Sequence, residues 1–204
     1  LQAKQQAPVP TRPEAEWLPF TEYVSKLHHE KNAAYGNSWC KRGERMAIMA
    51  NIARKVDRLG VSDNHDTAAD TAIDLLVYLI KYRLWLTDRA GAPVPKGIVD
   101  DKDHDLSSSV STKYVDQYLK LLGDSYERGN MAFHTGDNHT LERVLQYQFD
   151  HNLTLEAESR AEHRHGTVEG LIVPAYVLAR RLYRELGNAT RPFNGYATTD
   201  DEGA

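Results

Sequence analysis

Two segments with helical periodicity, joined by only six residues, most constrain what this chain can fold into. Apolar residues recur at helical spacing in residues 42–59 and again in residues 66–87. The connection over residues 60–65 (GVSDNH) is so short that the two helices must fold back on each other antiparallel. Residues at equal distance from the turn then face each other. The resulting apolar seam is predicted to hold Met49, Ile52 and Val56 against Leu76, Ile73 and Ala69.

A second stripe, one step round the same two helices, is charged. In the predicted register its members face each other in this order: Glu44, Asn51 and Lys55 against Lys81, Asp74 and Asp70. A charge beside an apolar core costs on the order of several kcal/mol unless it is paired or bound to a metal. The stripe is therefore the first candidate for a functional site.

Three aspartates, Asp66, Asp70 and Asp74, follow one another at four-residue spacing and so share one helical face. Like charges one turn apart repel each other, and a divalent cation between them would relieve the repulsion. Oxygen ligands without Cys or His indicate Mg²⁺ or Mn²⁺, with Glu44 as a further ligand. The same spacing also fits a plain ion-pair network with the cations of the first helix: Arg54, Lys55 and Arg58.

An aromatic pair brackets a tight polar turn, Tyr35-Gly-Asn-Ser-Trp39, just ahead of the hairpin. The turn ends a helix predicted over residues 21–34, because Gly36 and Asn37 favour left-handed backbone conformations. Such a turn can stack a ring on a base and offer polar groups to its edge, which makes Tyr35, Asn37 and Trp39 candidate ligands. The alternative is a helix C-terminal turn whose two aromatic side chains plug into the core.

Composition divides the chain into five parts and favours an all-α fold, because strand signals are absent. The parts are a flexible arm (1–20), a helical domain (21–90), a linker (91–109), a second helical segment (110–187) and a polar tail (188–204). Within the second segment the periodicity predicts helices over 111–128, 140–150, 154–165 and 168–186. Thr21 and Thr167 are predicted N-caps, and Pro174 is expected to kink the last helix.

Composition also excludes several classes of protein. A net charge of −4 gives no overall electrostatic case for binding nucleic acid or an anionic membrane. A single cysteine, Cys40, cannot form a disulfide or a cysteine zinc site within one chain. No apolar run approaches the roughly 20 residues of a membrane span, and no secretory signal is recognisable, so a cytoplasmic location is expected.

In their order and spacing, several of these motifs resemble nucleotide modification associated domain 1, a family related to the all-α, MazG-like nucleotide pyrophosphohydrolases. The similarity covers residues 22–88. The residues that carry it are Lys31, the Tyr35–Trp39 turn, Lys55 with Arg58 and Leu59, and Asp70 with Asp74, Leu75 and Tyr78.

The resemblance implies a MazG-like helical bundle that assembles as a dimer or tetramer and cleaves a nucleoside triphosphate to monophosphate and pyrophosphate with Mg²⁺. It also implies that the protein comes from a phage that alters nucleotide pools, and hence that it is located in the cytoplasm of a host cell. Asp70 and Asp74 would bind the metal with Asp66 or Glu44, while Lys55 and Arg58 stabilise charge on the phosphates. The residues expected to bind substrate are Lys31, Tyr35, Asn37, Trp39, Asn51 and Lys81.

The chain departs from this pattern on the first helix of the hairpin. MazG-like enzymes carry a glutamate-rich motif there, whereas this helix offers only Glu44 and has Asn51 and Lys55 where further acids would stand. With fewer acids, a metal would be held more weakly or by the phosphates of the substrate. The opposing hypothesis is therefore a non-catalytic helical protein that binds a nucleotide or takes part in an assembly.

Overall fold

All regular structure in the described part of the chain is helical, so the predicted all-α fold class is confirmed. The computed structural model describes residues 18–61, 65–98, 112–131, 136–153 and 163–190, without the side chains of 65–67 and 188–190. Its α-helices are α1 (Phe20–Tyr35), α2 (Ala50–Val56), α3 (His65–Ala90), α4 (Thr112–Glu127), α5 (Asn138–Gln148) and α7 (His165–Thr190). Shorter elements are the 3₁₀ turn η1 (Gly36–Trp39) and the π-helical segments η2 (Glu44–Met49) and η4 (Phe149–Leu153).

The predicted helices agree with these elements except at some ends. α1 begins at Phe20 after Pro19, and α7 begins at His165, so neither Thr21 nor Thr167 is an N-cap as predicted. Pro174 lies inside α7. Most of the helix predicted over 154–165 falls outside the described residues, as do the flexible arm up to residue 17 and the linker from residue 99 onward.

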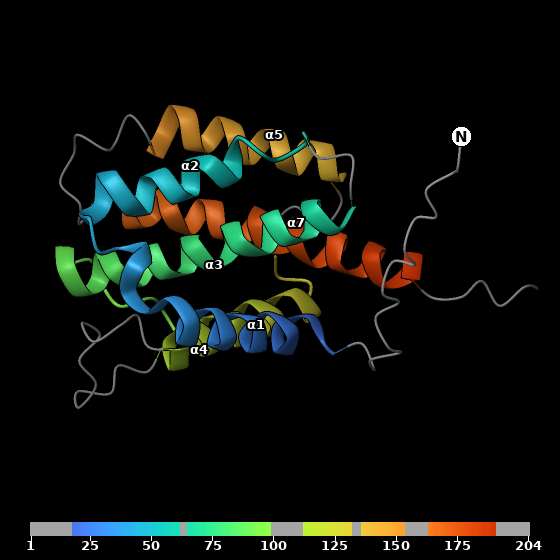
Figure 1. The fold of residues 1–204 in the computed structure, drawn as a ribbon, viewed down its shortest axis with the longest axis horizontal. Coiled ribbons are helices and arrows are strands. Elements are labelled where there is room, and N and C mark those ends of the chain that lie inside the picture. Colours follow the sequence, from blue (N-terminus) through green and yellow to red (C-terminus); the bar gives the residue numbers. More distant parts are fainter. Residues whose placement is uncertain (1–17, 62–64, 99–111, 132–135, 154–162, 191–204) are drawn as a thin grey trace, which may run out of the picture.

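The helices form three layers around one hydrophobic core (Figure 1). α3 and α7 lie side by side in the middle layer, α2 and α5 cover one side, and α1 and α4 cover the other. The core cluster joins residues of the predicted domain over 21–90 to residues of the segment over 110–187, so the second segment packs on the first within this chain. None of the helices in the described ranges combines the length and apolar character needed to cross a bilayer.

The predicted hairpin seam is buried except at Met49, which lies in η2 and is only partly buried. Ile52 and Val56 of α2, and Ala69, Ile73 and Leu76 of α3, are each at most 2% exposed. The first predicted helix, however, is not uniform: Glu44–Met49 is π-helical and follows Gly43, whose φ of 79° is left-handed. A π turn closes its hydrogen bonds one residue later than an α turn, so it shifts the phase of the side chains around the helix. Glu44 lies in this segment, so its position in the charged stripe is not the one predicted for a uniform α-helix.

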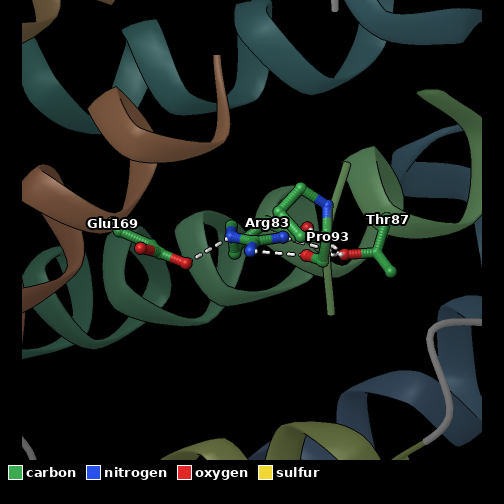
Figure 2. A network of polar contacts seen from close by, with 4 residues as sticks. All are labelled: Arg83, Thr87, Pro93 and Glu169. Carbon is green, nitrogen blue, oxygen red and sulfur yellow. Dashed lines mark hydrogen bonds and ion pairs between the residues drawn. The ribbon is translucent and has the colours of Figure 1, made fainter. Parts of the chain in front are cut away.

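A buried arginine ties the middle layer together (Figure 2). Arg83 on α3 is 1% exposed, and its Nε donates to Glu169 Oε1 on α7 at 2.7 Å. Its other nitrogens donate to Thr87 Oγ1 and to the Pro93 carbonyl oxygen, each at 2.8 Å. Pro93 follows the end of α3, so this one guanidinium fixes the chain's exit from α3 and the position of α7 together.

Replacing Glu169 with Gln should lower the free energy of unfolding by about 2–4 kcal/mol, because the buried guanidinium of Arg83 loses its carboxylate. The expected loss lies below the largest values for breaking a buried ion pair, because the Glu169 side chain is 42% exposed and partly hydrated. Urea denaturation measures the change. The control is Glu30→Gln on the exposed side of α1, which should change stability by less than about 0.5 kcal/mol. Equal effects of the two substitutions would contradict the structural role of the Arg83 pair.

Candidate functional site

A cavity of about 400 Å³ opens between α1, η1 and α3. We call it the α1–α3 cavity. Its apolar wall includes Val24, Leu27, Ile73 and Val77. It also brings together five of the residues predicted to bind substrate or metal, and these are Lys31, Tyr35, Trp39, Asp74 and Lys81.

Asp74 is held between two lysines at the wall of the cavity. Lys31 Nζ donates to its Oδ1 at 2.5 Å, and Lys55 Nζ donates to its Oδ2 at 2.6 Å. Burial by itself raises the pKa of Asp74, but the hydrogen bonds and charges of the two lysines outweigh that effect and hold the pKa below its ordinary value. Asp74 is therefore an ionised carboxylate with both oxygens engaged.

This pairing corrects the predicted register, in which Lys55 faced Asp70 and Asn51 faced Asp74. Lys55 reaches Asp74, one turn farther along α3, while Asp70 is exposed. Asn51 instead accepts a hydrogen bond from Arg54, its neighbour on α2. Counting residues from the turn gives only approximate facing positions for two packed helices, and the long side chain of Lys55 reaches the next turn of α3.

Glu44 was predicted to face Lys81 and to bind metal, but it lies in a different network. Arg164, which precedes α7, donates to Glu44 Oε1 from Nε at 3.1 Å and to Oε2 from its terminal nitrogen at 2.5 Å. The Tyr82 hydroxyl also donates to Glu44 Oε1. The arrangement ties η2 and α3 to the start of α7. Glu44 therefore acts as a structural partner in this arrangement.

The described donors do not fit a resident divalent cation. Within the described ranges, no three His, Cys, Asp or Glu side chains lie close enough to share one ion. A cation at Asp74 would compete with two ammonium groups for the same oxygens. The side chain of Asp66 lies outside the described residues, so a site built on Asp66 with Asp70 stays a prediction.

Lys81 differs from the other charged residues of the α1–α3 cavity in its burial. It is 6% exposed, and its Nζ lies 4.5 Å from the ring centroid of Trp39. Burial lowers its pKa from 10.5 to about 8. No carboxylate of the described chain forms an ion pair with it. Lys81 thus carries a largely desolvated positive charge whose main contact is the face of an aromatic ring.

The two aromatic residues of the turn have different environments. Trp39 is 5% exposed and packs in the core, whereas Tyr35 is 71% exposed at the mouth of the cavity. Both readings of this turn therefore hold in part: one ring is a core residue and the other is available for stacking. Gly36 is left-handed as predicted, with a φ of 52°.

Besides Lys55, Asp70 and Glu44, three more predicted site residues lie outside the lining of the α1–α3 cavity. Asn37 is exposed, and its backbone carbonyl accepts from the Cys40 amide at 3.2 Å. Asn51 lies on α2, and Arg58 is exposed in the turn that follows α2. None of the three lines the cavity.

Two cavity residues were missed by the sequence reasoning, His28 and Asn32. His28 is 3% exposed, and its pKa falls from 6.5 to about 4, first because of burial and then because of the nearby Lys81 charge. The spacing of His28 in the sequence could have indicated its burial, because His28 follows Val24 by four residues and so lies on the apolar face of α1. Asn32 follows one turn later on the same face.

The charges of the α1–α3 cavity favour an anion. Lys31 and Lys81 line the cavity together with a single described carboxylate, Asp74, which Lys55 contacts from α2. The neutral walls are apolar or aromatic, which is typical of a pocket that also receives an uncharged organic group.

Comparisons of the chain with protein-family models, with curated proteins and with solved structures found no match. The similarity to nucleotide modification associated domain 1 therefore stays a prediction.

The buried His28 should make the fold acid-sensitive. Its pKa is about 4 in the folded chain and 6.5 ordinarily, so its stabilising contribution is complete above pH 6.5 and is lost as the pH falls toward 4. Between pH 7 and pH 5 the loss should be about 2 kcal/mol. His28→Phe should remove that part of the decline, whereas His139→Gln, at a side chain that is 78% exposed, should not. Urea denaturation at both pH values is the measurement, and an unchanged decline in His28→Phe would refute the assignment.

Proposed function

We propose that this chain binds a nucleotide in the α1–α3 cavity. The observation that carries the proposal is the buried ammonium group of Lys81, which pairs with no carboxylate of the described residues, in a cavity that Lys31 also lines. Lys55 contacts Asp74 at the wall of this cavity. The phosphates would lie against these lysines. The base would enter the apolar part of the cavity, with Tyr35 available to stack on it at the mouth.

The charge of Lys81 supports an anionic ligand. Burial has already removed most of its hydration, and the lowered pKa measures that cost. An anion bound beside it would compensate the charge in surroundings where hydrogen bonds to charged groups are strong. Phosphate oxygens are acceptors only, and an ammonium group is a donor only, so the two match.

The size and walls of the cavity support a nucleotide over a bare phosphate. A volume of about 400 Å³ falls within the range of pockets that enclose small organic ligands. The aliphatic side chains of Leu27, Ile73 and Val77 would gain nothing from a bare phosphate, but they suit the flat faces of a base. The aromatic ring of Tyr35 adds a stacking surface.

Hydrolysis is the second candidate, favoured by the placement of an ionised Asp74 among the phosphate-binding lysines. The reaction is the one implied by the resemblance to nucleotide modification associated domain 1, in which a nucleoside triphosphate is hydrolysed to monophosphate and pyrophosphate with Mg²⁺ or Mn²⁺. The same resemblance implies assembly as a dimer or tetramer. Lys55 would then stabilise charge that develops on the phosphates. The alternative is a protein that binds the nucleotide without cleaving it.

Nucleotide binding should depend on Lys81. In calorimetric titrations with the common nucleoside triphosphates and no added metal, Lys81→Met should weaken binding by about 10- to 100-fold, because a charge-assisted contact is lost. The matched control is Lys26→Met, an exposed lysine of α1 that does not line the cavity. Absence of binding to any nucleotide, or equal affinity of the two variants, would contradict the proposal.

The product decides between the two candidates. The purified chain is incubated with each nucleoside triphosphate and Mg²⁺, and the products are separated by ion-exchange chromatography. Monophosphate and pyrophosphate that disappear in Asp74→Asn would support hydrolysis at this site. Binding without turnover would select the non-catalytic reading, and diphosphate with orthophosphate would exclude the pyrophosphohydrolase.

A further inference from the structure

Three buried polar atoms without a hydrogen-bond partner gather at the α1–α3 cavity. Within the described chain, the side-chain atoms of this kind include His28 Nε2, Asn32 Oδ1 and Trp39 Nε1, and all three residues line the cavity. A buried donor or acceptor that is left unpaired costs about 1–3 kcal/mol. Three such atoms at one cavity are groups that a bound molecule with matching donors and acceptors could pair.

The three atoms define what that molecule must offer. The Trp39 indole nitrogen only donates, so it requires an acceptor. Asn32 Oδ1 only accepts, so it requires an N–H or O–H group. The His28 ring is neutral near pH 7, because its pKa is about 4, and its Nε2 donates or accepts according to the tautomer. The ligand must therefore present a donor and an acceptor side by side.

The three residues come from two consecutive elements that line the same cavity. His28 and Asn32 are one helical turn apart on α1 and so point from the same face. Trp39 stands in η1, directly after the turn that ends α1. Lys81 covers one face of the Trp39 ring, which leaves its N–H rather than that face for the ligand.

A phosphate group does not meet these requirements. When ionised, its oxygens accept hydrogen bonds and give none, so they would leave Asn32 Oδ1 unpaired. The edge of a nucleobase carries an N–H group next to a carbonyl oxygen or a ring nitrogen, which are the required donor and acceptor. The phosphates would remain with the lysines, and the base edge would meet the polar atoms of α1 and η1.

We propose that Asn32, His28 and Trp39 read the hydrogen-bonding edge of the base and so determine which base this chain prefers. The inference rests on the proposed nucleotide-binding function and extends it to specificity. It also moves the contact with the polar edge from Asn37, where the sequence placed it, to Asn32. Trp39 contributes through its indole N–H.

Asn32→Leu tests the inference, because leucine has a similar size and lacks the amide. Binding is measured by calorimetry with nucleoside triphosphates of each common base, and with inorganic tripolyphosphate as a base-free probe. For the unsubstituted chain, the nucleoside triphosphate with the preferred base should bind about 10-fold or more tightly than the one with the least preferred base. Asn32→Leu should remove most of this preference and leave the affinity for tripolyphosphate unchanged. His28→Phe should reduce the preference in the same way.

Asn37→Leu is the matched control, since Asn37 is exposed and does not line the cavity. It should keep the base preference. Thermal denaturation adds a second readout: Asn32→Leu should not lower the melting temperature without ligand, because it removes an unpaired buried carbonyl.

The outcomes separate this inference from the proposed function. If nucleotides bind with the same base preference in Asn32→Leu as in the original chain, the edge-reading assignment is overturned and nucleotide binding stands. Unpaired atoms that are satisfied by ordered water would give that result. If the original chain binds tripolyphosphate but shows no preference among bases, the assignment is likewise overturned. If it binds no nucleotide at all, the proposed function falls, and this inference with it.

Discussion

The burial of α3 on nearly every side is the constraint on which the rest of the structure depends. A helix in the middle layer has almost no solvent-facing side, so each polar side chain on it needs a partner from a neighbouring helix. Arg83 finds Glu169 on α7, Tyr82 contacts Glu44 of η2, and Asp74 receives lysines from α1 and α2. Each of these contacts orients one neighbouring element against α3. Lys81 is the exception, since its charge faces the α1–α3 cavity without a described carboxylate.

Most of the fold follows from local patterns in the sequence. Apolar periodicity over 66–87 predicts α3, and the six-residue connection predicts the hairpin that buries Ile52 against the apolar face of α3. These inferences succeed because periodicity and short connections act over a few turns. The same reasoning identified Asp74 and Lys55 as partners of opposite charge on facing helices. It paired each of them with the wrong neighbour, because counting residues from a turn gives neither the exact packing of two helices nor the reach of a lysine side chain.

The remaining errors come from contacts between distant parts of the chain. Glu44 was predicted to be a metal ligand because it is an acid near two aspartates, but its partner is Arg164, 120 residues later in the sequence. Nothing in the hairpin indicates which residue will arrive from α7. His28 and Asn32 were missed for a related reason: a polar residue on an apolar helical face shows that it is buried, but only the packed structure shows whether it meets a partner or a cavity.

The two lysines that line the α1–α3 cavity, Lys31 and Lys81, and the Lys55 that contacts Asp74 are not equivalent toward an incoming phosphate. A phosphate that takes Lys31 or Lys55 must compete with an ionised Asp74, so part of each new contact is offset by the loss of an existing one. Lys81 has no hydrogen bond to a described carboxylate that an anion would have to replace, and its ammonium group already loses most of its hydration when the chain folds. An anion therefore gains most at Lys81, deep beside Trp39, and least at the half-exposed Lys31. This gradient would draw the phosphates toward the Lys81 ammonium group over the face of the Trp39 ring, and it leaves the N–H at the edge of that ring to the base. The base edge would then lie along α1, where Asn32 and His28 present their unpaired atoms.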